Sequence, residues 1–114
     1  MLDKKFRLRK QKDFDRISKE GVYFSEHCLL MKAMRNDLEI TRFGFIVSNK
    51  ISGVAAKRNR IKRLLREAVR SSRDKLKEGY DCLFIAKGSI VEKESEEIKW
   101  TVEKLLRKSG LFKE

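Results

Sequence analysis

The stretch KRNRIKRLLREAVR, residues 57–70, decides how the rest of the chain is arranged. Seven of its fourteen residues are basic and one, Glu67, is acidic. A solvated helix face usually mixes charges of both signs, so this one-sided charge indicates a binding surface for an anionic partner. The apolar residues recur at the i, i+3, i+4, i+7, i+8 spacing of one helix face: Ile61, Leu64, Leu65, Ala68 and Val69.

The whole chain shares this basic character. Its 114 residues carry 29 Lys and Arg against 17 Asp and Glu, a formal net charge of +12. Such an excess indicates a polyanion as partner, chiefly nucleic acid or else an anionic membrane surface. The length is sufficient for one core, so we expect a single domain over residues 1–114.

Two further features bear on the compartment. No apolar run approaches the roughly 18 residues that a membrane-spanning helix needs, and residues 1–12 are basic but lack the apolar middle of a signal peptide. Cys28 and Cys82 each lie in an apolar run, which is typical of buried, reduced cysteines in a cytosolic protein. We therefore expect a cytoplasmic protein that does not associate with a membrane.

The elements around the basic helix are predicted from periodicity and from turn residues. Residues 1–12 are expected to form a basic arm that is either mobile or docked, since Phe6 and Leu8 interleave with its charges. We also expect a turn at residues 36–37 short enough to make the second and third strands an antiparallel pair. Gly44 within a strand indicates close backbone approach or a bulge. The predicted helices span residues 12–20, 57–77 and 95–108, and the strands span 22–25, 27–35, 42–47 and 80–86.

This order, αβββαβα, predicts an α+β two-layer sandwich with helices covering one face of a sheet. The other sheet face, beside the first helix, is expected to remain open as a cleft.

Catalytic groups are scarce. His27 is the single histidine, no spacing suggests a metal site or a nucleophilic triad, and no glycine-rich phosphate cradle is present. What remains is electrostatics, in three basic patches: the arm, the loop around Lys50, and the helix at 57–70. Asn59 is a weak helix former, which favours a role for its amide in binding over a purely structural one.

The same residues carry a family resemblance. Gly53-x4-Arg58-Asn59-Arg60-Ile61-Lys62-Arg63-x2-Arg66-Glu67 resembles the arginine-rich signature helix of the bacterial ribonuclease P protein family. The resemblance extends along nearly the whole chain in the same order. It includes Arg7-Leu8, Asp13-Phe14, Gly21, Val47-Ser48-x-Lys50, and a final helix ending Leu105-Leu106-Arg107-Lys108.

The resemblance implies a fold that contains a left-handed β-α-β crossover. It also implies a role as the protein subunit of an RNA-based endonuclease that removes the 5′ leader of precursor tRNA. The expected partners are the ribonuclease P RNA and precursor tRNA, with no obligate protein partner. In this family the catalytic RNA holds the Mg²⁺ ions, so we expect no catalytic side chain in the protein.

Two sets of site residues follow. For binding of the catalytic RNA we expect Lys50, Lys57, Arg58, Asn59, Arg60, Lys62, Arg63, Arg66 and Arg70. For the leader-binding cleft we expect Arg7, Arg9, Phe14, Ile17, Ser18, Leu30 and Lys32. Ser18 and Lys32 stand where the family can have aromatic residues, which weakens stacking in the leader site and leaves its charge intact.

Three other functions are compatible with the residues alone. The first is a ribosomal or general RNA-binding protein of the same fold. The second is a DNA-binding protein that places the basic helix in a major groove, although no short helix-turn-helix partner precedes residue 57. The third is a stand-alone nuclease, which the lack of a general base disfavours.

Overall fold

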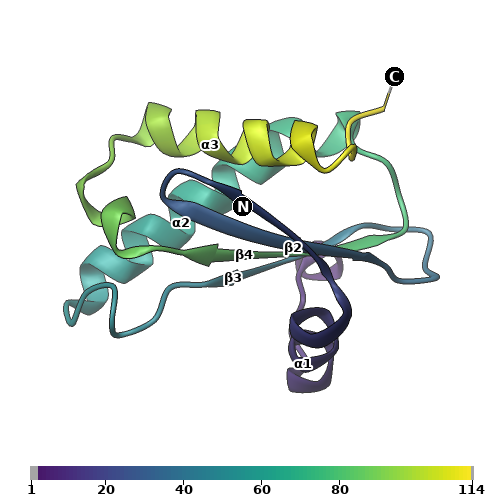
Figure 1. The fold of residues 1–114 in the computed structure, drawn as a ribbon, viewed down its shortest axis with the longest axis horizontal. Helices are drawn as coiled ribbons and strands as arrows, with labels where there is room; N and C mark the ends of the chain where they lie inside the picture. Colours follow the sequence, from purple (N-terminus) through teal and green to yellow (C-terminus); the bar gives the residue numbers. More distant parts are fainter. Residues whose placement is uncertain (1–2, 114) are drawn as a thin grey trace.

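The computed structural model describes residues 3–113. Figure 1 shows α2 and α3 side by side over one face of a sheet, with α1 against the opposite face. This is the predicted α+β architecture. The main elements are α1 (Gln11–Glu20), β1 (Val22–Glu26), β2 (Leu29–Arg35), β3 (Arg42–Ile46), α2 (Ala55–Ser72), β4 (Tyr80–Ala86) and α3 (Ser95–Lys108).

The predicted order of elements is confirmed, and β4 and α3 have the predicted bounds. The basic helix is shorter than predicted, because α2 gives way to a 3₁₀ turn at Arg73–Lys75. The strand predicted from residue 27 begins at Leu29, since His27 has a left-handed φ of 46° and forms the turn after β1.

The strand order is β1-β2-β4-β3, with β2 antiparallel and β3 parallel to β4. The prediction that β2 and β3 pair is therefore wrong. Cys82 and Phe84 on one face of β4 and Leu83 on the other are all fully buried, and a strand that is apolar on both faces requires a central position. The β3-α2-β4 unit is the crossover that the family resemblance implies, and its left hand stays a prediction.

The core lies between the sheet and the α2–α3 layer. Along β2, Leu29, Met31 and Ala33 point into it and alternate with the half-buried Leu30, Lys32 and Met34. The predicted inward face of α2 is confirmed, apart from Leu64, which is half-buried at the edge. Both cysteines are buried and unbonded, as expected, and burial raises the pKa of the Cys82 thiol.

Two glycines allow α1 to lie close to the sheet. A Cβ on Gly44 would stand 2.8 Å from Cε1 of Phe14, and a Cβ on Gly21 would stand 2.5 Å from the carbonyl oxygen of Ile17. Gly21 has a φ of −68°, a value that any residue can adopt. Glycine is therefore required at this position because a side chain would not fit, and not because the backbone is left-handed. The prediction that Gly44 marks a close approach is confirmed.

The N-terminal arm is docked from residue 3 onward, and residues 1–2 lie outside the described part of the chain; of the two expected states, docked and mobile, the structure shows the docked one. The Leu8 amide donates to the Phe43 carbonyl at 2.7 Å, Arg7 forms a parallel bridge with Phe43, and the Leu8 side chain is buried. The arm thus covers the outer edge of β3, an edge that would otherwise present unpaired backbone groups.

A buried ion pair ties α1 to the sheet. Arg42 donates from Nε and Nη2 to the two oxygens of Asp81 at 2.9 and 2.8 Å. The Asn36 side-chain amide also donates to Asp81, at 2.9 Å, and Asp13 of α1 lies 3.5 Å from Arg42. The hydrogen bonds to Asp81 raise the pKa of Arg42, so the guanidinium stays charged.

We predict that Asp81→Ala lowers the free energy of unfolding by about 1–3 kcal/mol, because it removes the acceptor of the half-buried Arg42 guanidinium and of the buried Asn36 amide. Urea unfolding measures the loss. The matched control is Arg16→Ala, which removes an exposed pair with Glu20 and should cost less than about 1 kcal/mol. Equal losses in the two variants would contradict a special role for the buried pair.

Candidate nucleic-acid interface

The outward side of α2 carries basic groups without acidic partners. Within residues 3–113, no basic residue of α2 takes part in an ion pair, although α3 and the sheet hold several such pairs. Glu67 is the one acid of the helix and is exposed. Among the residues predicted to bind the catalytic RNA, the outward side of α2 presents exposed side chains at Asn59, Arg63 and Arg70 and half-buried ones at Lys62 and Arg66.

Close like charges on one helix repel one another, so this surface is electrostatically unfavourable until an anion binds. The N-terminus of α2 adds to the effect. Its first turn contains no acidic residue and no side-chain cap, so its unpaired amides and the helix dipole contribute more positive potential. Lys57 is exposed at this end.

The loop before α2 is held by the helix itself. Arg58 donates from Nη1 to the Ser52 carbonyl at 2.8 Å, and the Ser52 hydroxyl accepts from the Val54 amide at 3.1 Å. Arg58 therefore orders the loop that contains the exposed Lys50. Arg60 is half-buried, so its guanidinium is less accessible than that of Arg63.

A second surface lies on the sheet face beside α1. Residues paired across neighbouring strands share a face, and the register places six side chains here. We call this surface the open face. Its centre is apolar and only half-buried. It consists of Tyr23, Ser25, Leu30, Lys32, Ile46 and Ile85.

Helix α1 crosses the strands at one side of the open face. Phe14 packs over Gly44 of β3, and the ammonium of Lys32 on β2 donates to the Ser18 carbonyl at 2.6 Å. Leu83, between these two points, is fully buried, whereas its neighbour Ile85 is half-buried. Phe14, Ser18, Leu30 and Lys32 are therefore brought together, as the sequence predicted.

Ile17 does not belong to this accessible group. Its side chain is completely buried between α1 and the sheet, so it cannot touch an RNA strand. Its prediction as a leader-binding residue is wrong. Ile17 lies three positions after Phe14 and one before Ser18, and helical spacing alone could not tell which of these neighbours points into the sheet.

Arg7 and Arg9 lie apart from the open face. They line a hollow of about 610 Å³ together with Arg42 and Asp13. Along β3, Arg42 of the hollow and Ile46 of the open face lie on opposite sides of Gly44. Phe14 of α1 packs over Gly44, so α1 separates the basic hollow from the open face. The structure does not gather the predicted leader residues into one site.

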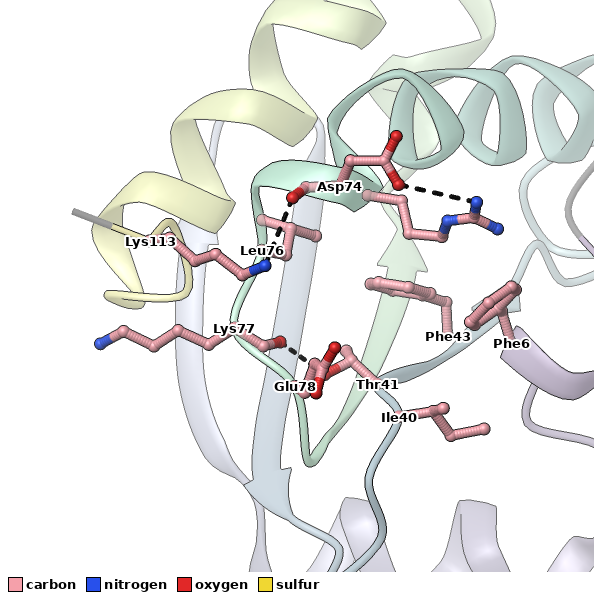
Figure 2. Close-up of a pocket in the computed structure, with 10 residues that line it drawn as sticks. Phe6, Ile40, Thr41, Phe43, Asp74, Leu76, Lys77, Glu78 and Lys113 are labelled. Carbon is pink, nitrogen blue, oxygen red and sulfur yellow. Dashed lines mark hydrogen bonds and ion pairs between the residues drawn. The ribbon is translucent and has the colours of Figure 1, made fainter.

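Figure 2 shows a further hollow, of about 180 Å³, between the arm and residues 73–78, the segment that joins α2 to β4. Phe6 and Phe43 form its apolar wall, and Arg73 lies over the Phe6 ring at 4.1 Å. Arg73 also approaches Asp74 at 3.7 Å. Because its apolar wall comes from Phe6 of the arm and Phe43 of β3, and Arg73 packs on Phe6, we interpret this hollow as part of the docking of the arm.

Sequence reasoning missed several residues around the open face. Ser25, Ile46 and Ile85 could be assigned to the open face only from the pairing of residues between strands. Lys87, just after β4, donates to the Ser25 hydroxyl at 3.0 Å and places a second ammonium group beside Leu30 and Ile85. The correct pairing of β4 was the missing information, since it decides which alternate residues meet.

Catalytic chemistry has little support in the described part of the chain. No group of three or more His, Cys, Asp or Glu side chains in residues 3–113 could hold a metal ion. His27 lies 3.1 Å from Glu26 and faces the Trp100 ring of α3, away from both candidate surfaces. No described helix is long and apolar enough to cross a bilayer.

Comparisons with known proteins agree with this geometry. The sequence profile of the Ribonuclease P family matches residues 2–110. The chain belongs to the ribonuclease P protein family. It is 39% identical, over its whole length and 97% of the relative, to the ribonuclease P protein component of Caldanaerobacter subterraneus subsp. tengcongensis.

Solved structures of bacterial RNase P proteins have the same fold. A mutant RNase P protein from Staphylococcus aureus has a TM-score of 0.89 at 28% identity, covering 96% of this chain and 92% of that one. The Thermotoga maritima RNase P protein has a TM-score of 0.81 at 26% identity, covering 90% and 96%. The chain is therefore a ribonuclease P protein component that acts with ribonuclease P RNA in tRNA 5′ processing. The ribosomal or general RNA-binding alternative receives no support.

We predict that the α2 surface binds RNA through charge. Arg63→Gln with Arg66→Gln keeps the aliphatic stems, so thermal stability should change little. Each lost phosphate contact should flatten the log–log salt dependence of RNA binding by roughly 0.7–0.9 units, about one to two units for the pair. The measurement is a salt titration with ribonuclease P RNA.

The control for this charge change is Lys99→Ala with Lys104→Ala, which also removes two positive charges, from the exposed side of α3. It should leave the salt slope nearly unchanged. If both double variants alter the slope equally, net charge and not the α2 surface determines binding.

Proposed function

We propose that this ribonuclease P protein uses two surfaces for two RNAs. In the proposal, α2 and the Lys50 loop bind the catalytic RNA, and the open face with Phe14 binds the single-stranded 5′ leader of precursor tRNA. The observation that carries the proposal is the run of seven basic residues along α2, none of which takes part in an ion pair within residues 3–113.

The α2 surface suits a folded RNA because it presents positive charge along a rigid element. Neutralising phosphates releases counterions, and this supplies most of the affinity of such interfaces. Binding would also relieve the repulsion among Lys62, Arg63 and Arg66. Asn59 is exposed beside them, where its amide can donate to a phosphate or accept from a 2′-hydroxyl.

The open face suits an unpaired strand. Leu30, Ile46 and Ile85 form a partly exposed apolar floor, Phe14 supplies an aromatic ring, and Lys32 and Lys87 supply charge. Unpaired bases bind to such a combination of aromatic faces and basic groups. Residues 47–54 run directly from Ile46 at the end of β3 to α2 (Figure 1), so the two surfaces are joined by one short loop.

The chemical step is assigned to the RNA. Mg²⁺ bound by the RNA would activate the attacking water. Lys and Arg stay protonated near neutral pH, so the residues of the α2 surface cannot act as a general base. This chain would therefore position the substrate and reduce phosphate repulsion, and it would contribute no catalytic side chain.

We predict that Phe14→Leu reduces the preference of the assembled enzyme for precursor over mature tRNA. Leucine preserves most of the packing over Gly44 but has no aromatic face. Stacking of one base on an aromatic ring is worth roughly 1–3 kcal/mol. The measurement is the ratio of the two dissociation constants. An unchanged ratio, with a lower melting temperature, would assign Phe14 to packing alone.

We also predict that the RNA-free protein does not cleave precursor tRNA in Mg²⁺. Adding the ribonuclease P RNA should produce cleavage at the mature 5′ end. The assay compares cleavage products before and after that addition. Specific 5′ cleavage by the RNA-free protein, abolished by His27→Ala or Asp13→Ala, would instead identify a protein nuclease.

A further inference from the structure

Tyr23 is a large aromatic side chain left exposed on the open face. Its residue is 56% exposed, although it lies within β1. Its cross-strand partner in the antiparallel register is Lys32, so the two side chains are neighbours on the same face. Within residues 3–113, the Tyr23 side chain takes part in no hydrogen bond, ring pair or cation–π contact.

The surroundings of Tyr23 lack other rings. Ser18 carries none, and the Lys32 ammonium is occupied by the Ser18 carbonyl. On the open face and the adjoining side of α1, the two aromatic residues are therefore Phe14 and Tyr23. Phe14 stands over β3 and Tyr23 stands on β1, at opposite margins of the sheet.

We propose that Tyr23 stacks on an unpaired base of the precursor tRNA leader and is the second aromatic contact of the leader site. The inference rests on the proposed function of the open face. An accessible ring with a nearby cation is the arrangement that binds a nucleobase together with its phosphate. Tyrosine also loses little conformational entropy on binding, since two torsion angles define its side chain.

The two rings contact different nucleotides. The strand order β1-β2-β4-β3 places three strand spacings between β1 and β3, on the order of 14 Å at about 4.8 Å each. One base cannot span that separation. The leader would pass from Phe14 over Ile85 and then Leu30 to Tyr23, which makes the second aromatic contact at the β1 margin.

The test uses the holoenzyme assembled with ribonuclease P RNA. The main variant is Tyr23→Thr, which removes the ring and keeps a residue suited to a strand, and Tyr23→Phe keeps the ring. Trp100→Ala is the matched control, because Trp100 is similarly exposed, at 49%, but lies on α3 beyond the other sheet face. The substrates are precursor tRNA, mature tRNA, and precursors with one abasic leader nucleotide at successive positions.

We expect Tyr23→Thr to weaken precursor binding relative to mature tRNA by about fivefold to 100-fold, and Tyr23→Phe and Trp100→Ala to bind as the wild type does. One abasic leader position should weaken precursor binding by the wild-type enzyme and make its affinity equal to that of the Tyr23→Thr enzyme. That position should differ from the one sensitive to Phe14→Leu.

Each contrary outcome is distinguishable. If Phe14→Leu impairs leader-dependent binding but Tyr23→Thr does not, the inference about Tyr23 is overturned and the leader site stands. If Tyr23→Phe loses as much as Tyr23→Thr, the hydroxyl and not stacking is responsible, which also overturns it. If no variant affects the preference for the leader, the proposed leader site itself is wrong.

Discussion

The burial of β4 on both faces is the constraint from which the rest of the fold follows. Leu83 is fully buried under α1, and Cys82 and Phe84 are fully buried under the helical layer. A strand of this kind must lie inside the sheet, so it separates β2 from β3 although these are consecutive in the chain. The crossover through α2 is the consequence, and it places the basic helix across the sheet from α1.

Asp81, the one charged residue of β4, helps to fix the position of α1 on the sheet. Asp81 is almost completely buried, so it requires the hydrogen bonds it accepts from Arg42 and Asn36. Arg42 in turn reaches Asp13 of α1. Together with the close contact of Phe14 on Gly44, this network fixes where the helix crosses the strands and how much of the sheet face remains accessible.

The distribution of acids explains why one helix stays positively charged. Glu26 pairs with both Lys104 and Lys108, and the hydrogen bond from Lys108 is the main reason why the pKa of Glu26 is lowered. Other acids pair within α1, α3 and the sheet. Within residues 3–113, none of these ion pairs involves a basic residue of α2, so the positive charge of this helix remains uncompensated. The partner RNA is expected to neutralise it.

The sequence by itself determined the order of the elements, the inward face of α2 and the charge of its outward face, because helical periodicity and charge spacing are local properties. It also identified the family, through the contiguous motif around Arg58 and Asn59. The strand pairing, the burial of Ile17, the separate hollow at Arg7 and Arg9, and the place of Tyr23 beside Lys32 were decided only by tertiary structure. The place of Tyr23 follows from the register between β1 and β2. The strand pairing follows from β4 lying between β2 and β3, two strands that are close in sequence. This long-range arrangement buries apolar surface, and the local sequence around residues 36–37 does not reveal it.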